Sequence, residues 1–273
     1  MKRRGEKIAM LTAYDFPSAR LLDEAGVPLL LVGDSLGMVV LGYDSTIPVT
    51  VEEMIHHGAA VVRGSKKAIV VVDMPFMSYQ VSPEEALRNA GRIMQKTGAQ
   101  AVKLEGGSSM VETIRRMVES GIPVMGHLGL TPQSVNQLGG YRVVGKRFAE
   151  AERLVEDALA IQEAGVFAMV LESVPAPLSG IISEKLKVPT IGIGAGVHCD
   201  GQVQVFHDIL SLFEDFDPKH ARKYDDLGQR IKAAAEHYAA DVLSGDFPSK
   251  EESFTMEEKT IRRLEERFNP DYS

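Results

Sequence analysis

The amino-acid sequence predicts an α/β protein, a (β/α)8 barrel followed by a C-terminal helical tail. Three observations lead to this prediction: eight short apolar runs alternate with helical segments, helix start and stop signals stand between them, and ionisable residues close several runs. Continuous apolar runs are typical of parallel strands that are buried on both faces. Eight strand–helix units in about 215 residues suit a fold whose usual size is ~250 residues.

The eight apolar runs are the predicted strands. In order they are KIAMLTAYD (7–15), PLLLVGDS (28–35), AIVVVDMP (68–75), AVKLEGG (101–107), PVMGHLG (123–129), FAMVLES (167–173), PTIGIGAG (189–196) and QVQVFHD (202–208). Only residues 197–201 separate the last two, which is room for about one helical turn. The seventh helix is therefore expected to be vestigial, or the eighth strand to be slightly misplaced. An open doubly wound sheet is the alternative that the same alternation allows.

The helices between the runs are marked at both ends. A Ser or Thr followed three residues later by Glu, the capping-box pattern, occurs at 50–53, 82–85 and 109–112. Several helices end in a glycine that suits a left-handed C-cap. These glycines are Gly26, Gly98, Gly121 and Gly165. Residues 149–164 have the clearest amphipathic pattern.

The C-terminal part is charged and mostly helical by periodicity, with a break at residues 245–249. No stretch has the length and polarity of an interdomain linker. The sequence therefore predicts one domain over residues 1–273, with residues 215–273 as a helical extension of the same domain.

Composition excludes several classes of protein. The net charge is −8 and no basic stripe stands out, which argues against nucleic acid or an anionic membrane as the main partner. No run approaches the ~18 apolar residues of a membrane span. Cys199 is the only cysteine, so no intrachain disulfide is possible. A soluble cytoplasmic protein is expected.

Ionisable residues lie at or near the ends of five of the predicted strands. They are Asp34, Asp73, Lys103, Glu105, His127 and Glu172. In a (β/α)8 barrel the C-terminal ends of the strands form the rim that carries catalytic residues. Lys103 and Glu105 are two residues apart, so their side chains point to the same side of the strand. The sequence thus predicts four carboxylates, a lysine and a histidine around one pocket.

Crowded carboxylates repel one another, and a divalent cation removes that repulsion. Oxygen ligands in small number favour magnesium over calcium, with Asp34, Asp73 and Glu105 as the candidates. Taken singly, an Asp at a strand end is more often a helix cap or turn residue. Lys103 can be a charge-compensated buried group or can hold an anionic substrate, and His127 can be a packing residue.

Long motifs carry a family likeness. GDSLGMVVLGYDSTIPVTVEEM, VVVDMPFMSYQVSPEEALRNAGRIMQKTGAQAVKLEGG, GIPVMGHLGLTPQSVNQLGGYRVVGK, VLESVPAPL and IGIGAG…CDGQVQVFHD occur in that order between about Thr12 and Ser211. Together they resemble the 3-methyl-2-oxobutanoate hydroxymethyltransferase (ketopantoate hydroxymethyltransferase) family. The resemblance implies a (β/α)8 barrel of the phosphoenolpyruvate/pyruvate superfamily.

The resemblance also implies a reaction. The hydroxymethyl group would pass from 5,10-methylenetetrahydrofolate to 3-methyl-2-oxobutanoate through a magnesium-stabilised enolate, which gives ketopantoate, in the first step of pantothenate and coenzyme A biosynthesis. The cofactors implied are Mg²⁺ and the folate co-substrate, and the assembly implied is a homodecamer. The folate-binding residues are not identified by the motifs.

Residue roles follow motif by motif from the same resemblance. Metal association is implied for Asp34, Asp73 and Glu105. Substrate binding is implied for Asp34, Ser35, Asp73, Lys103 and His127, with Lys103 and Ser35 at the substrate carboxylate. Glu172 is the implied catalytic base for the C3 proton. Two alternatives are a metal-dependent 2-oxo-acid lyase of the same superfamily and a non-catalytic metabolite-binding barrel.

Overall fold

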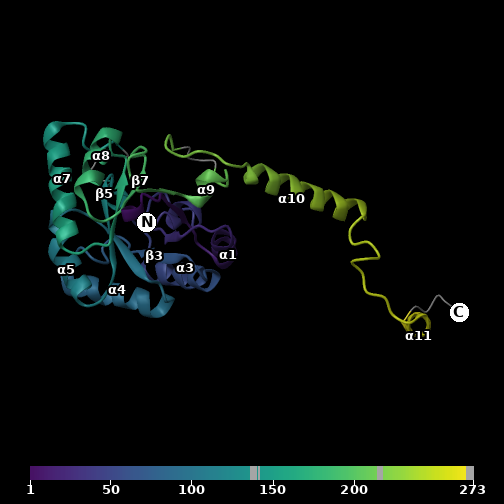
Figure 1. Ribbon diagram of the computed structural model, residues 1–273. Helices are drawn as coiled ribbons and strands as arrows, with labels where there is room; N and C mark the ends of the chain where they lie inside the picture. The colour runs from purple at the N-terminus through teal and green to yellow at the C-terminus, as the bar shows by residue number, and fades with distance from the viewer. Residues whose placement is uncertain (136–139, 141, 214–217, 269–273) are drawn as a thin grey trace. The chain divides into compact units, whose positions relative to one another are not determined.

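The strands close into a barrel, as predicted. The computed structural model describes residues 1–135, 140, 142–213 and 218–268. Within these residues the parallel strands hydrogen-bond in the order β1 to β8, and β8 returns to pair with β1. Figure 1 shows the helices on the outside of these strands. The (β/α)8 prediction is therefore confirmed, and the open doubly wound sheet is wrong.

The strands lie within the predicted apolar runs, except that β8 begins one residue before its run. They are β1 (Ile8–Thr12), β2 (Leu29–Val32), β3 (Ile69–Asp73), β4 (Ala101–Glu105), β5 (Val124–Gly129), β6 (Ala168–Glu172), β7 (Thr190–Ile193) and β8 (Gly201–Gln204). The eighth strand is shorter than its predicted run, because the chain turns into helix α9 at Phe206. Residues 194–200 connect β7 to β8 by turns without a helix, so the seventh helix is absent rather than short.

Helices separate the other strands, and three more follow β8 in the described part of the chain. They are α1 (Phe16–Glu24), α2 (Leu36–Val39), α3 (Val51–Gly64), α4 (Pro83–Thr97), α5 (Val111–Glu119), α7 (Phe148–Glu163), α8 (Ala176–Lys185), α9 (Phe206–Ile209), α10 (Leu227–Ser244) and α11 (Glu258–Phe268). Single 3-10 turns lie at η1 (Lys2–Arg4), η2 (Ser108–Met110) and η3 (Pro132–Ser134).

Local signals set most helix ends. Thr50 and Glu53 form the full reciprocal capping box, and the Ser82 side chain accepts from the N–H of Glu85. The box predicted at residues 109–112 is wrong: α5 begins after η2, its N-cap is Met110, and Met110 supplies no side-chain cap. All four predicted C-cap glycines have positive φ, between 78° and 105°.

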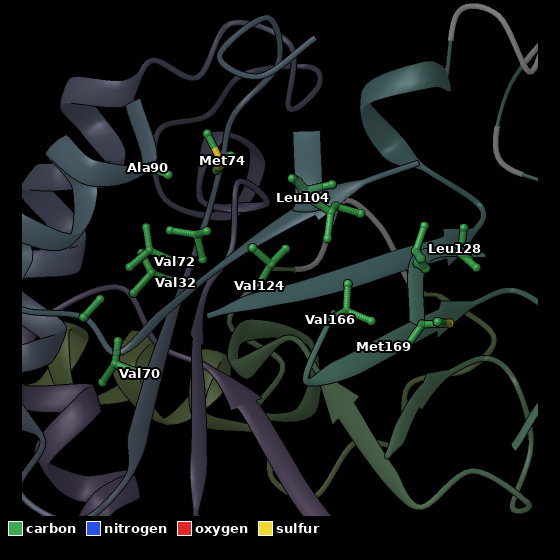
Figure 2. Packing of buried hydrophobic residues seen from close by; sticks show 14 of the residues in the cluster. Val32, Val70, Val72, Met74, Ala90, Leu104, Val124, Leu128, Val166 and Met169 are labelled. Carbon is green, nitrogen blue, oxygen red and sulfur yellow. The ribbon is translucent and has the colours of Figure 1, made fainter. Parts of the chain in front are cut away.

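Strand alternation sorts the apolar residues into two cores. One core lies between the barrel and the helices and contains Val32, Val72 and Leu104 together with residues of the helices (Figure 2). The other contains only strand residues, among them Leu31, Val71 and Met125, and fills the barrel interior. Lys103 and Glu105 alternate with Val102 and Leu104, so both point into the barrel, as the sequence predicted.

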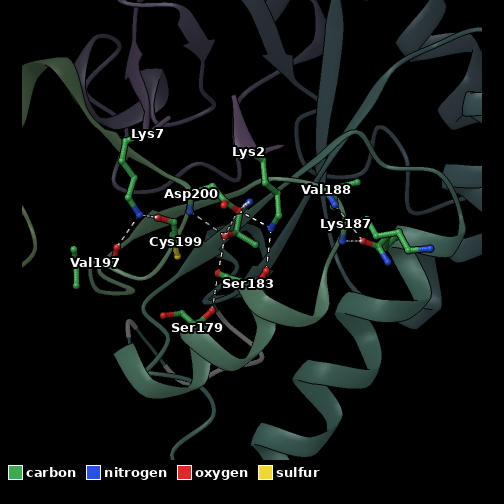
Figure 3. A network of polar contacts seen from close by, with 11 residues as sticks. Lys2, Lys7, Ser179, Ser183, Lys187, Val188, Val197, Cys199 and Asp200 are labelled. Carbon is green, nitrogen blue, oxygen red and sulfur yellow. Dashed lines mark hydrogen bonds and ion pairs between the residues drawn. The ribbon is translucent and has the colours of Figure 1, made fainter. Parts of the chain in front are cut away.

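A polar network ties the N-terminal segment to the end of the barrel opposite the site. Lys2 Nζ donates to Asp200 Oδ2 at 2.8 Å and to the Ser183 carbonyl at 2.9 Å (Figure 3). Asp200 Oδ2 also accepts from the Thr190 N–H at 2.8 Å. Burial alone would raise the pKa of Asp200, but the bonds from Lys2 and Thr190 outweigh it and lower that pKa.

The chain divides into two units, Met1–Asp225 and Asp226–Ser273. The first contains the whole barrel. The second contains α10, which ends at Gly245 in a left-handed conformation, and α11. The break predicted at residues 245–249 is therefore confirmed. That residues 215–273 belong to the barrel domain stays a prediction, and residues 214–217 lie outside the described part of the chain. In the described residues no helix is long and apolar enough to cross a membrane.

Candidate active site

The predicted site residues meet at the carboxyl ends of the strands. Asp73, Glu105 and Glu172 are the last residues of β3, β4 and β6, and Lys103 and His127 lie in β4 and β5. Asp34 and Ser35 follow β2 directly. The strand register brings Asp73 level with Lys103, and Glu105 level with His127. Five neighbouring strands thus deliver seven predicted residues to one rim.

Lys103 lies next to the carboxylates of Asp73 and Asp34. Its Nζ is 3.0 Å from Asp73 Oδ1, and both side chains are almost fully buried. Asp73 Oδ2 accepts a hydrogen bond of 3.1 Å from the backbone N–H of Asp34. Burial lowers the pKa of Lys103, but the charges of Asp73, Glu105 and Asp34 outweigh it and raise that pKa, so the ammonium is retained.

His127 lies between Glu105 and Glu172. Its Nδ1 is 3.3 Å from Glu105 Oε1, and its Nε2 is 3.2 Å from Glu172 Oε2. Nδ1 is also 3.3 Å from Lys103 Nζ. Burial and the Lys103 charge lower the pKa of His127, but the two glutamates outweigh them and raise it to about 9. The raised pKa favours the cationic imidazole, whose two ring nitrogens face the two carboxylates, although Nε2 makes no aligned hydrogen bond.

Gln133 is a site residue that the sequence analysis did not single out. It lies in η3, just after β5, and is buried. Its Nε2 donates to Asp34 Oδ2 at 2.8 Å, and its backbone N–H donates to Glu105 Oε2 at 3.2 Å. Its position at the end of the GHLGLTPQ motif could have marked Gln133 as a residue near the site. The motif does not show which side chain Gln133 would hydrogen-bond.

Ser35 is supported by Tyr14, which the sequence analysis also left without a role. The Tyr14 hydroxyl and Ser35 Oγ are 2.8 Å apart. Tyr14 is buried, and burial raises the pKa of its hydroxyl despite the hydrogen bond with Ser35. The neutral phenol of Tyr14 therefore fixes the position of the Ser35 hydroxyl through a hydrogen bond.

A cavity of about 550 Å³ opens above these residues. That volume is ordinary for a small-molecule site. Its lining includes Asp34, Ser35, Asp73, Lys103 and Glu172, together with apolar residues of the strands. Glu105 and His127 do not line it and lie behind the residues that do.

The electrostatics of the cavity floor suit a cation. Burial, followed by the charges of Asp73 and Glu105, raises the pKa of Asp34 to about 8. Burial also raises the pKa of Asp73, although Lys103 opposes it. Asp73 Oδ1 is buried and, despite its closeness to Lys103, makes no aligned hydrogen bond. An added positive charge next to these oxygens would relieve the repulsion.

Within the described ranges, no three His, Cys, Asp or Glu side chains are arranged to hold a metal ion by themselves. Mg²⁺ does not need three protein side chains as ligands, because it is commonly bound through one or two carboxylates plus waters and substrate oxygens. Asp34 and Asp73 fit that pattern. Glu105 is engaged by His127 and Gln133, and its predicted metal association stays a prediction.

Comparison with known families gives one match over most of the chain. The family model described as ketopantoate hydroxymethyltransferase matches residues 1–250. A 3-methyl-2-oxobutanoate hydroxymethyltransferase of Dehalococcoides mccartyi (strain CBDB1) is 59% identical over 264 residues, which cover 97% of this chain and 95% of the relative. The enzyme of that name from Chloroflexus aurantiacus (strain ATCC 29366 / DSM 635 / J-10-fl) is 60% identical over 257 residues, or 94% and 91% of the two chains.

Solved structures match the fold at much lower identity. A 2,3-dimethylmalate lyase, described as a PEP mutase/isocitrate lyase superfamily member, has a TM-score of 0.59 and 17% identity over 99% of this chain and 94% of its own. A phosphonopyruvate hydrolase in complex with oxalate and Mg²⁺ has a TM-score of 0.60 and 12% identity over 97% and 95%. At these identities the likeness shows the fold alone, and that fold is the expected barrel.

Proposed function

The chain belongs to the ketopantoate hydroxymethyltransferase family and is an enzyme that transfers a hydroxymethyl group to 3-methyl-2-oxobutanoate; we propose how its residues do so. The observation that carries the proposal is the cavity whose wall combines Asp34, Asp73, Lys103 and Glu172. It presents a cation, a pair of crowded carboxylates and a separate glutamate to one small ligand. A 2-oxo acid has the matching groups, a carboxylate, a keto oxygen and an acidic C–H.

Lys103 and Ser35 bind the substrate carboxylate in this proposal. Lys103 is held as an ammonium by the surrounding carboxylates. Ser35 is held by Tyr14 and lines the same cavity. A charge-assisted bond to a fixed ammonium orients the substrate, so that C3 faces one wall of the cavity.

Asp34 and Asp73 would hold Mg²⁺, with the charge of Glu105 nearby. When bound, the ion supplies Lewis-acid withdrawal of charge from the keto oxygen, which acidifies the neighbouring C3–H. Asp73 Oδ1 is the oxygen best placed for this role, since it is buried and lacks an aligned hydrogen bond.

Glu172 takes the C3 proton in this proposal. Its side chain is 15% exposed and lines the cavity, whereas its Oε2 is 3.2 Å from His127 Nε2. A general base must be ionised and must face the proton it removes. His127 lies behind the cavity wall, close to both Glu172 and Glu105, so in this proposal it acts on the substrate only through these two carboxylates.

The one-carbon donor is proposed to be 5,10-methylenetetrahydrofolate, bound in the outer part of the same cavity. Over the whole reaction the C3–H bond and both C–N bonds of the folate methylene break, tetrahydrofolate leaves, and water supplies the oxygen of the new hydroxyl group. The new C–C bond requires the one-carbon unit to lie directly against C3 of the substrate, so the two ligands cannot occupy separate pockets. A homodecamer, which rests on the family resemblance, and a cytoplasmic location, which rests on the sequence composition, remain proposals.

Proton NMR in deuterated water tests the proposal. We expect 3-methyl-2-oxobutanoate to lose its C3–H signal when protein and Mg²⁺ are present, and to keep it when EDTA is added. Ketopantoate should accumulate only after methylenetetrahydrofolate is supplied. Exchange of the C3–H that persists in EDTA would rule out a role for the metal ion in proton removal. Ketopantoate formed without the folate would rule out methylenetetrahydrofolate as the one-carbon donor.

A further inference from the structure

Gln133 makes hydrogen bonds to two predicted site residues, Asp34 and Glu105, and to residues next to them. Its side-chain Nε2 donates to Asp34 Oδ2 at 2.8 Å and to the Met74 carbonyl at 2.9 Å. Its Oε1 accepts from the Tyr79 hydroxyl at 2.7 Å and from Gln80 Nε2 at 3.2 Å. A primary amide has two donor hydrogens and one carbonyl oxygen with two lone pairs. Every hydrogen-bonding position of this amide is therefore used.

The orientation of the amide is determined by its partners. The Tyr79 hydroxyl accepts from the Glu105 N–H at 3.2 Å, so its own hydrogen points to Gln133 Oε1. A flipped amide would place Oε1 against the Asp34 carboxylate and the Met74 carbonyl, where every neighbour is an acceptor. Only one orientation satisfies all partners, and in it Nε2 faces Asp34.

The same residue also holds a second carboxylate. The backbone N–H of Gln133 donates to Glu105 Oε2 at 3.2 Å. Side chain and backbone together thus connect two carboxylates that stand 71 positions apart in the sequence, since the Asp34 bond spans 99 positions and the Glu105 bond spans 28. Gln133 is only 4% exposed, so water does not replace these bonds.

We propose that Gln133 is a positioning residue: by donating to Asp34 Oδ2 and to Glu105 Oε2 it fixes the carboxylates that surround the divalent-cation site. The inference rests on the proposed function for the presence of that site. Fixing Oδ2 stops rotation of the Asp34 carboxylate, so its other oxygen keeps one direction. Hydrogen bonds from outside the ligand shell commonly contribute 10–100-fold to metal affinity.

Direct Mn²⁺ binding, measured by the electron paramagnetic resonance signal of the free ion, tests the proposal without any substrate. The variant is Gln133→Met, which keeps the length of the side chain and loses all four side-chain bonds. Gln162→Met is the matched control. The Gln162 amide oxygen accepts from the N–H groups of Lys187 and Val188, near the start of β7 and away from the cavity.

We expect Gln133→Met to raise the dissociation constant for Mn²⁺ by roughly 10–100-fold, and Gln162→Met to leave it within about twofold of the wild-type value. If Gln133→Met does not fold, Gln133→Asn keeps an amide in the pocket but is too short to reach Asp34, and its affinity should fall in the same direction. A folded Gln133 variant with wild-type Mn²⁺ affinity would overturn the proposal. Wild-type protein that binds no Mn²⁺ would overturn it together with the proposed cation site.

Discussion

Removal of Lys103 should strongly destabilise the barrel. In Lys103→Met the apolar stem is kept and the ammonium is lost, 3.0 Å from Asp73 Oδ1. At an effective dielectric constant of about 20, two unit charges at that distance attract by about 5–6 kcal/mol. Breaking a buried pair by removing one partner costs about 3–5 kcal/mol, because the other charge stays buried and unpaired. We expect a loss of that size in the free energy of unfolding.

The assay is urea unfolding in EDTA, which keeps divalent cations from replacing the ammonium. Arg92→Met is the matched control, since its guanidinium is 2.6 Å from Glu52 Oε1 but both side chains are well exposed. Exposed pairs contribute about 0.2–1 kcal/mol. If Lys103→Met costs no more than Arg92→Met, the carboxylates around Lys103 are not charged in the native state, and the electrostatic account of the site is wrong.

The loss should depend on pH with a definite sign. Without Lys103 the pKa values of the buried Asp73 and Asp34, already raised, rise further. The native state then binds more protons than the unfolded state, so the free energy of unfolding falls as pH rises. The deficit relative to wild type is expected to be larger at pH 8.5 than at pH 6.

Three further predictions use other parts of the chain. Glu172→Gln should slow C3–H exchange of the substrate by at least about hundredfold, the usual lower bound for a general base, with Mn²⁺ affinity unchanged; full exchange would exclude the assignment. Asp200→Asn should cost about 1–2 kcal/mol at pH 7 and less at pH 3. The hydrogen bond from Lys2 lowers the pKa of this carboxylate, so its contribution to stability declines once pH falls below the unfolded-state pKa; equal losses at both pH values would contradict this. Gly129 has φ +96°, and a Cβ there would overlap the Glu172 carbonyl, so Gly129→Ala should cost roughly 2–5 kcal/mol in urea unfolding. Gly121→Ala is the control: Gly121 has φ +85°, and an added Cβ there would contact nothing, so only the backbone strain remains and the cost should be smaller. Equal costs for the two variants would show that the overlap with the Glu172 carbonyl at position 129 is relieved.

The fold was predictable because its signals are local. Each strand is a short apolar run, and the period-2 alternation by itself placed Lys103 and Glu105 on the same side. The failures were local too. Ser109 does not cap α5, because η2 occupies the segment where the box was expected, and the last predicted strand ends early where α9 begins.

The positions of the site residues along the strands were equally predictable. Because all strands of a parallel barrel end at the same rim, residues that close apolar runs converge there whatever their separation in sequence. Asp73, Lys103 and Glu172 were therefore identifiable as neighbours, and the cavity lining agrees. Ser35 was identified by motif resemblance alone, since nothing in its spacing distinguishes it from a helix cap.

The sequence by itself determined the barrel, the rim and the residue types gathered on it, because hydrophobic period and strand ends are properties of the chain read in order. The tertiary structure alone decided which partner each polar atom has. It put Glu105 and His127 behind the cavity wall, Tyr14 behind Ser35, and Gln133 between Asp34 and Glu105. Hydrogen bonds depend on distances of tenths of an ångström between segments far apart in sequence, and only the packed barrel sets those distances.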